Sequence, residues 1–316
     1  MQEILNDYAK RSRYPNQPTK MRCIFESSDL WEIQLSTGKV ELGKDGKFND
    51  DISDALSICG AVDMTVNFAS EGKKLSDSDW KTWFFNRIYN KWIVIDTNFV
   101  LRHYFSSILA TRMTKDELKK IVLYMPRMVV LEIERRGNES KKDGIEGKNK
   151  RLAFYAAKEI RDLRELTNFD MIPLIDPSLM VEFAEREGSG FGDMWIRKEV
   201  HDLVKYPSIG LTNSISSTDV VFITCDLMNS MAAEAEGLTS CYFSRLTQEN
   251  FSVYRYDSQF FNFVIANAVI FGKIKIDFIE SNGDAEDSFV IEGVWKGKTT
   301  SEWYSDCLRV DWLSAK

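Results

Sequence analysis

The stretch that decides the fold is Trp92-Ile93-Val94-Ile95-Asp96-Thr97-Asn98-Phe99. Its first four residues are apolar and predict a short buried strand. That strand delivers a carboxylate at Asp96, and then a hydroxyl and an amide at the start of a helix. An aspartate ahead of a helix is commonly an N-cap, so this stretch taken alone indicates a strand followed by a helix and no chemistry.

A second stretch has the same arrangement, because Val220–Cys225 reads as a buried strand that ends in Asp226. In open parallel sheets, ligands bind at the edge where the carboxyl ends of the strands meet. If the two strands are neighbours, Asp96 and Asp226 lie side by side at that edge. Two carboxylates so close together repel each other, and a hard divalent cation such as Mg²⁺ or Mn²⁺ relieves the repulsion.

Glu132 is a third candidate acid. It interrupts the apolar run Met128–Ile133 on a predicted helix, where a carboxylate is costly unless it is paired or binds a metal. The alternative is an amphipathic helix on which Glu132 pairs with Arg135 and Arg136. Glu134 is the competing acid, but it lies two residues further along and faces another way.

Asp193 is the fourth candidate, since it opens a predicted helix directly after the glycine-rich loop 188–192. Helix capping is the alternative role for this side chain. Asp219 is the rival acid. It precedes its strand, however, and therefore belongs to the opposite edge of the sheet from Asp226.

From Trp92 onward the strand and helix patterns alternate, which is typical of a parallel sheet with helices on both faces. We therefore predict a three-layer α/β domain over residues 91–248, flanked by β-containing accessory regions at residues 1–90 and 249–316. Within the α/β domain, the patterns predict helices over 99–110, 115–120, 126–136, 151–166 and 193–204, and further strands over 121–125, 171–175 and 240–243. In the flanking regions they predict strands over 21–25, 30–35 and 303–312, a hairpin of 274–278 with 289–293, and helices over 54–62, around Trp80, Trp83 and Phe84, and over 260–271.

Composition narrows the classes of protein that fit. The net charge of −7 argues against a non-specific binder of duplex nucleic acid. The five cysteines are scattered without a CxxC pair, which suggests reduced thiols in the cytoplasm, and two histidines argue against a zinc site. The first residues lack the pattern of a signal peptide, and the longest apolar stretch, around residues 260–271, is too short to span a bilayer, so we expect no membrane partner.

Residues 91 to about 245 resemble the PIN domain, a metal-dependent nuclease fold. Ile95-Asp96-Thr97-Asn98 looks like the first motif of that family, and Pro126–Glu132 looks like the second, a helix that begins at a proline and presents an acid. Gly192–Ile196 is a weaker match to the third motif. Val220–Asp226, with the small-residue helix that follows, is similar to the fourth.

The resemblance implies a Mg²⁺- or Mn²⁺-dependent endoribonuclease that hydrolyses RNA phosphodiester bonds through a cluster of carboxylates. It assigns Asp96 and Asp226 as principal metal ligands, with Glu132 and Asp193 as ligands or as bases that orient water. Asn98 and Thr224 would hold the carboxylates in place. The choice of RNA as the substrate comes from the family resemblance alone. The resemblance also allows an inhibitor protein and a homodimer as partners.

Charge suggests where a nucleic acid strand would lie. Residues 111–165 are locally basic within an acidic chain, and Arg135, Arg136, Lys141 and Lys142 follow Glu132 closely, so they could contact phosphates. Arg197, one turn beyond Asp193, is a further candidate. The alternative for most of these residues is a solvated helix face followed by a polar loop.

Two other functions compete with the nuclease. The first is a catalytically weak PIN-like domain that serves as an RNA- or protein-binding scaffold. The second is a phosphatase of the haloacid-dehalogenase type, also built on a strand that ends in an aspartate. That family places a second aspartate two positions after the first, where this chain has Asn98, so the phosphatase ranks below the scaffold.

Overall fold

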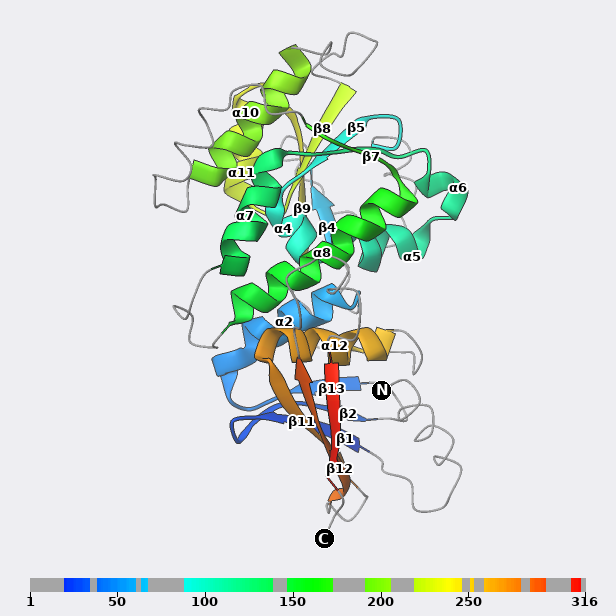
Figure 1. Ribbon diagram of the computed structural model, residues 1–316, viewed down its shortest axis with the longest axis vertical. Coiled ribbons are helices and arrows are strands. Elements are labelled where there is room, and N and C mark those ends of the chain that lie inside the picture. Colours follow the sequence, from blue (N-terminus) through cyan, green and yellow to red (C-terminus); the bar gives the residue numbers. More distant parts are fainter. Residues whose placement is uncertain are drawn as a thin grey trace. The chain divides into compact units, whose positions relative to one another are not determined.

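The computed structural model describes residues 20–34, 39–60, 64–67, 88–138, 147–172, 191–205, 219–245, 251–252, 259–279, 285–293 and 308–313. The chain folds as two compact units (Figure 1). The antiparallel unit comprises residues 1–62, 139–157 and 247–316, and the parallel unit comprises residues 63–138 and 158–246. One helix, α8 (Lys148–Leu166), contributes residues to both units.

The parallel unit is built on a six-stranded sheet with the order β4-β9-β8-β5-β6-β7. Its strands are β4 (Met64–Asn67), β5 (Trp92–Ile95), β6 (Val122–Met125), β7 (Asn168–Met171), β8 (Val220–Thr224) and β9 (Thr239–Arg245). The five strands from β9 to β7 pair in parallel, and β4 adds to β9 in the antiparallel sense. This arrangement confirms the α/β prediction. It also makes β5 and β8 direct neighbours, with Ile95 opposite Ile223, so that Asp96 and Asp226 leave the sheet at the same edge.

Helices connect these strands. They are α4 (Thr97–Leu101), the π-helix η2 (Phe105–Leu109), α5 (Ala110–Arg112), α6 (Lys115–Leu118), α7 (Arg127–Asn138), α10 (Phe191–Lys205) and α11 (Leu227–Ala235). Helix α7 packs against α10 and contacts α4, while α11 packs on β8 and β9. Helix α7 therefore lies beside both α4 and α10.

The antiparallel unit joins the two ends of the chain in one seven-stranded sheet. Its order is β10-β3-β2-β1-β11-β12-β13, with β1 (Lys20–Phe25), β2 (Ser28–Gln34), β3 (Lys39–Leu42), β10 (Phe251–Ser252), β11 (Lys273–Ile279), β12 (Ala285–Gly293) and β13 (Leu308–Leu313). The link is the pairing of β1 with β11, and the predicted hairpin of β11 with β12 is confirmed. Strands from both flanking regions thus complete a single sheet.

Two helices, α2 (Asn49–Ile58) and α12 (Gln259–Phe271), supply the apolar core of this unit together with the sheet, and the short 3₁₀ helix η1 (Gly46–Phe48) precedes α2. Trp31 on β2 packs against Phe263, and its indole Nε1 donates a hydrogen bond of 3.0 Å to the buried Asn267. Helix α2 begins five residues before the predicted position 54, because Asp50 and Asp51 suit the positive end of a helix in its first turn.

Arg151 ties the first turns of α8 to α12. Its Nε donates to the carbonyl of Val269 at 2.5 Å, and its Nη2 donates to that of Ile270 at 2.7 Å. These carbonyls belong to the last turn of α12, where the helix itself has no N–H group left to donate to them. Gly272 follows with φ +79, and a Cβ there would lie 2.9 Å from the guanidinium. Arg151 therefore acts as the C-terminal cap of α12.

We expect Arg151→Met to lower the free energy of unfolding by about 2–3 kcal/mol, because two buried carbonyls lose their donors. Thermal unfolding followed by circular dichroism would measure this loss as a lower midpoint. Arg164→Met is the matched control, since Arg164 lies exposed on the same helix. Equal midpoints for the two variants would show that Arg151 does not cap α12.

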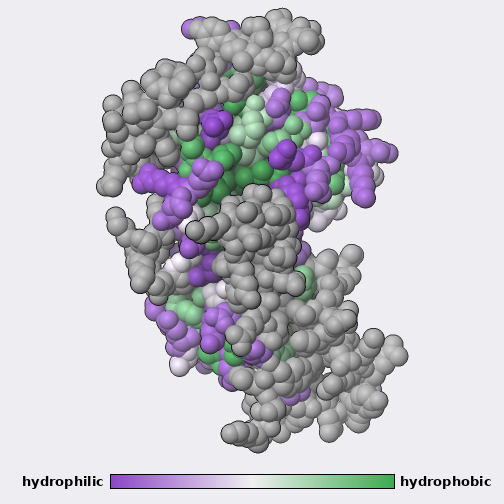
Figure 2. Space-filling view, viewed as in Figure 1, coloured by the Kyte–Doolittle hydropathy of each residue, from purple (hydrophilic) through white to green (hydrophobic). Residues whose placement is uncertain are grey.

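Polar and charged side chains cover much of the described surface, with hydrophobic surface between them (Figure 2). Among the helices in the described ranges, none has both the length and the apolar character needed to cross a membrane.

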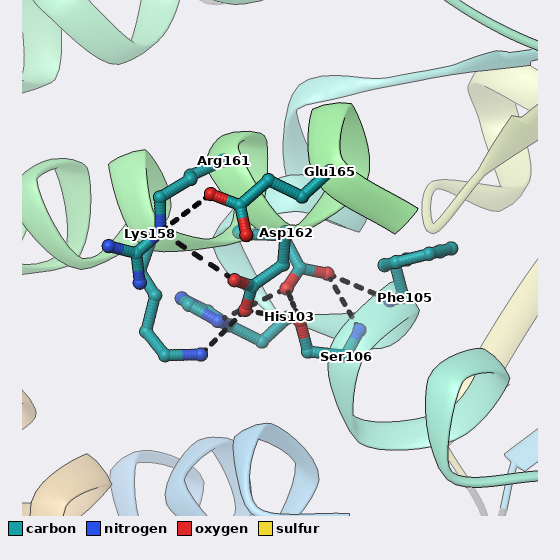
Figure 3. A network of polar contacts seen from close by, with 8 residues as sticks. His103, Phe105, Ser106, Lys158, Arg161, Asp162 and Glu165 are labelled. Carbon is teal, nitrogen blue, oxygen red and sulfur yellow. Dashed lines mark hydrogen bonds and ion pairs between the residues drawn. The ribbon is translucent and has the colours of Figure 1, made fainter. Parts of the chain in front are cut away.

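The predicted helix over 99–110 is interrupted in the structure. Helix α4 ends at Leu101, and His103 adopts φ +54 before η2 starts. The cause is Glu159 of α8, a completely buried carboxylate that accepts the N–H groups of Phe105 (2.8 Å) and Ser106 (3.1 Å). A new helical segment begins where these N–H groups are capped, in the polar network that also includes Asp162 and Lys158 (Figure 3).

The predicted strand over 171–175 was placed too far along the chain. Strand β7 covers Asn168–Met171 and starts directly after α8, with Asn168 N–H donating to the carbonyl of Ile121 at 2.9 Å. Because β7 is the edge strand, the exposed Asn168 and Asp170 can face solvent, which the apolar pattern did not suggest. Trp80, Trp83 and Phe84, together with most of residues 171–175, lie outside the described residues or at their limit.

Candidate active site

Asp96 sits at the junction of β5 and α4 and is almost completely buried, with 1 % of its surface exposed. Its Oδ1 accepts the N–H of Phe99 at 2.8 Å, which makes it the N-cap of α4. Its Oδ2 accepts the hydroxyl of Thr224 at 2.5 Å and the N–H of Cys225 at 3.2 Å. Burial raises the pKa of Asp96 to about 6, even though these donors stabilise its charged form.

Asp226 occupies the equivalent place after β8. Its Oδ1 accepts the N–H groups of Met228 (2.7 Å) and Asn229 (3.2 Å), so it is the N-cap of α11. Its own N–H donates to the hydroxyl oxygen of Thr224 at 3.0 Å. The buried Thr224 thus donates to one aspartate and accepts from the backbone of the other, and this holds the two strand ends in register.

Glu132 approaches from α7. The hydroxyl of Thr97 donates to its carboxylate. On the other side lies Gly192, in the first turn of α10, where a Cβ would stand only 1.6 Å from Glu132 Oε1. The position before Asp193 therefore has to be glycine if Glu132 keeps this place.

Asp193 on α10 faces the same edge of the sheet. The buried Asn229 donates its Nδ2 to Asp193 Oδ1 at 3.2 Å and accepts from Arg197 Nη1 at 2.6 Å. Burial, together with the negative charges of Glu132, Asp96 and Asp226, raises the pKa of Asp193 to about 6, while Arg197 opposes the increase. The four predicted acids come from four segments of the chain, and the charges of Asp96, Glu132 and Asp226 act on Asp193.

The other predicted site residues have different surroundings. Arg197 is bound to Asn229 and, through Nε at 2.9 Å, to Glu236, so its guanidinium supports the acids from α10. Arg135 is exposed and Arg136 half-buried on α7. Asn98 is half-buried beside Thr97, the residue that reaches Glu132. Lys141 and Lys142 lie outside the described residues.

Four further residues hold the acids, and the sequence patterns did not assign them this role: Thr97, Gly192, Glu199 and Asn229. Thr97 directly follows Asp96 and could have been found as a second polar group at the strand end. Asn229 stands three residues after Asp226, in the first helical turn, where a polar side chain faces the sheet edge. Gly192 reveals its role only in space, because the contact is with a helix sixty residues earlier in the chain.

Glu199 joins the two helices that carry Glu132 and Asp193. It projects from α10 and accepts the N–H of Arg127 at 2.6 Å and that of Met128 at 3.0 Å, so it caps the N-terminus of α7. It is 3 % exposed, and burial raises its pKa to about 7 against the effect of the two N–H groups. The helix cap thus comes from another helix, which orients the two acids relative to each other.

We expect Glu199 to make stability depend on pH. In the folded state its pKa is about 7, against an ordinary value near 4.5, so folding takes up a proton between these values. Its contribution is therefore fully present below about pH 4.5 and is lost as the pH rises through about 7. Glu199→Gln carries no proton in either state, so wild type should lose about 2 kcal/mol relative to this variant between about pH 5 and pH 8. Urea unfolding at each pH would measure the difference, and parallel curves would show that Glu199 is ionised throughout.

The carboxylates of the site suit a hard divalent cation, provided that water supplies part of its coordination. The four candidate ligands are carboxylates. Burial and the repulsion from the other three raise the pKa of Asp193, and a cation would relieve this repulsion. Within the described ranges, however, no three acidic, histidine or cysteine side chains stand close enough to hold an ion together. Mg²⁺ commonly takes one or two carboxylates and keeps several waters, so these residues fit an ion that is held partly through water.

Comparison with known proteins identifies the fold. A family model described as the PIN domain matches residues 93–244, from β5 to β9. No curated protein matches the chain significantly. The matched residues contain the five parallel strands and all four acids. Residues 93–244 are therefore a PIN domain, a family of typically metal-dependent nucleases that commonly bind divalent metals.

Proposed function

We propose that this protein is a Mg²⁺- or Mn²⁺-dependent endoribonuclease. The observation that carries the proposal is the convergence of Asp96, Glu132 and Asp226 on Asp193, whose pKa is raised by burial and by the charges of the other three acids. Bringing like charges together costs free energy, and such clusters are found mainly at functional sites. Carboxylates with raised pKa values at the carboxyl edge of a parallel sheet are typical of active sites.

Asp96 and Asp226 would hold the cation. Both are fixed by backbone N–H groups, and Thr224 sets their separation, so neither needs to reorganise when the ion binds. A bound divalent ion lowers the pKa of a water and stabilises the negative charge that develops on the phosphate. Glu132 and Asp193 would accept hydrogen bonds from the attacking water and orient it toward phosphorus.

Helix α7 would guide the strand. Arg135 and Arg136 lie three and four residues after Glu132, on neighbouring positions of the helix surface, and Arg135 is exposed. Both would contact phosphates next to the cleaved bond. RNA rather than DNA is the family's usual substrate, and this part of the proposal rests on the family alone.

The cytoplasm is the compartment that we propose for this enzyme. Cys23, Cys59, Cys225 and Cys241 are buried free thiols, and such cysteines persist in a reducing environment.

The experiment that tests the proposal is cleavage of a labelled single-stranded RNA by the full chain with Mn²⁺, with Mg²⁺ or with EDTA. We expect internal cutting with either metal and none with EDTA. A thermal shift measured with Mn²⁺ and no RNA provides an independent readout of ion binding. A folded protein that neither cuts RNA nor gains stability from Mn²⁺ would instead be a PIN-like scaffold.

A further inference from the structure

A series of hydrogen bonds links α10 to both ends of α11 beside the acids. Asn229, in the first turn of α11, donates its Nδ2 to Asp193 Oδ1 at 3.2 Å and accepts from Arg197 Nη1 at 2.6 Å. Arg197 Nε donates at 2.9 Å to Glu236, which directly follows the last turn of α11. Because Asp193 and Arg197 are four residues apart on α10, both reach α11 from the same side of their helix.

Arg197 determines which way the amide of Asn229 faces. A guanidinium group carries only donors, so the oxygen of the amide has to lie toward Arg197. The nitrogen then lies toward Asp193, where it donates. Asn229 is only 3 % exposed, so water cannot readily replace either partner. The contact with Arg197 thus keeps an N–H group directed at Asp193 Oδ1.

Asn229 also holds a second acid, because its backbone N–H donates to Asp226 Oδ1 at 3.2 Å. One buried residue therefore fixes carboxylates from two different helix starts. In the described part of the chain, no other side chain donates to Asp193, and Asn229 takes its Oδ1. This leaves Asp193 Oδ2 as the oxygen for a water molecule.

Charge suggested a phosphate contact for Arg197, but its surroundings favour another role. Its Nε and Nη1 are already bound, and its side chain is only 12 % exposed. Glu236 offsets its positive charge, and the other oxygen of Glu236 lies 3.4 Å from His201 Nε2, one turn further along α10. Phosphates bind cations that they can reach, such as the exposed Arg135 on α7.

We propose that Arg197 is a positioning residue: it fixes the amide of Asn229, which holds Asp193 so that Oδ2 faces the attacking water. The inference rests on the proposed nuclease function, since it takes Asp193 as a group that orients this water. Arg197 itself touches neither the water nor the RNA. Its loss would leave RNA binding intact and lower the rate of cleavage, because Asn229 could then turn its amide and release Asp193.

Two substitutions separate the hydrogen bonds of Arg197 from its charge. Arg197→Met removes both and keeps much of the length of the side chain. Arg197→Lys keeps the charge but loses the planar fork, and an ammonium group that pairs with the charged Glu236 does not also fix Asn229. Lys205→Met is the matched control, since it removes one positive charge from an exposed position at the end of the same helix.

The first readout needs neither metal nor RNA. It is the hydrogen exchange of the side-chain NH₂ group of Asn229, followed by ¹⁵N NMR and identified by the signal that is absent from Asn229→Asp. We expect exchange at least about tenfold faster in Arg197→Met than in wild type or Lys205→Met. Arg197→Lys should show the same change, and it serves as the test if Arg197→Met does not fold.

The second readout is activity compared with RNA binding. We expect both Arg197 variants to lower kcat about tenfold at unchanged KM, while Lys205→Met behaves like wild type. Affinity for a single-stranded RNA, measured with Ca²⁺ in place of Mg²⁺, should fall with salt concentration at the same slope for all four proteins. Loss of one phosphate contact would instead reduce that slope by about 0.7.

Three results would overturn the proposal. Unchanged exchange at Asn229 in the Arg197 variants would show that the guanidinium does not fix the amide. Faster exchange with unchanged kcat would show that Asp193 does not depend on it. A smaller salt slope in Arg197→Met, restored together with kcat in Arg197→Lys, would make Arg197 a phosphate contact. Failure of the nuclease proposal is distinct: the wild type would then not cut RNA with Mg²⁺ or Mn²⁺, while exchange at Asn229 would still respond to Arg197.

Discussion

Asp226→Asn is expected to abolish metal-dependent RNA cleavage, with a loss of at least about a hundredfold, while the protein stays folded. The substitution removes the negative charge that a cation needs and keeps the shape of the side chain. The two N–H groups of Met228 and Asn229 both donate to Oδ1, and the oxygen of an asparagine can accept them in the same way. Asparagine is also a good N-cap, so α11 should keep its start.

The measurement is the rate of cleavage of a labelled single-stranded RNA with Mn²⁺, together with the thermal shift that Mn²⁺ causes. Asp219→Asn is the matched control, because Asp219 precedes β8 and therefore lies at the opposite edge of the sheet. There its Oδ1 is 3.6 Å from Lys91 Nζ. It makes the same change in net charge far from the acids. Cleavage by Asp226→Asn at the rate of Asp219→Asn would remove Asp226 from the metal site.

Asp96→Asn should be equally inactive but less stable. Its Oδ1 accepts from Phe99, and its Oδ2 accepts from both Thr224 and Cys225, so an amide nitrogen in either position meets an N–H donor. Such a buried conflict costs about 1–3 kcal/mol. A loss of activity in Asp96→Asn alone would therefore be ambiguous, and Asp226→Asn is the decisive variant of the pair.

The positions of the two decisive strands could be predicted from the sequence because these strands are short, mainly apolar and followed by polar residues. The strand β5 was predicted with its observed bounds, and β8 to within one residue, since both lie in the middle of the sheet, where local pattern and burial agree. Edge strands do not share this property. Strand β7 exposes Asn168 and Asp170, and its pairing with β6 outweighed the apolar pattern that follows it.

Contacts between distant segments could not be predicted in the same way. The break at His103 depends on Glu159, and the start of α7 depends on Glu199, each on another helix. Both residues are carboxylates that accept from the N–H groups of a first helical turn. The sequence does not show which distant side chain will accept from such groups. The pattern of the chain indicated where acids would gather, but Thr97, Asn229 and Gly192 follow from the packing of α7, α10 and α11 around them.

Gly192→Ala is the second change for which we expect a large effect on activity, about tenfold to a hundredfold, with little loss of stability. The added Cβ would lie 1.6 Å from Glu132 Oε1 and 2.8 Å from its carboxyl carbon. This carboxylate is the far end of a flexible side chain, so it can move away at small cost to folding. When it moves, it leaves the hydroxyl of Thr97 and its place beside Asp193.

Kinetics of the double variant would decide whether the effect passes through Glu132. If Gly192→Ala acts by displacing this carboxylate, then Gly192→Ala combined with Glu132→Gln should be no slower than Glu132→Gln alone, since the second change removes what the first one moves. Gly46→Ala is the matched control, because a Cβ at that position meets Asn49 at an ordinary 3.5 Å. Additive losses in the double variant would mean that the glycine serves the site in another way, for example by setting the path of the backbone into Asp193.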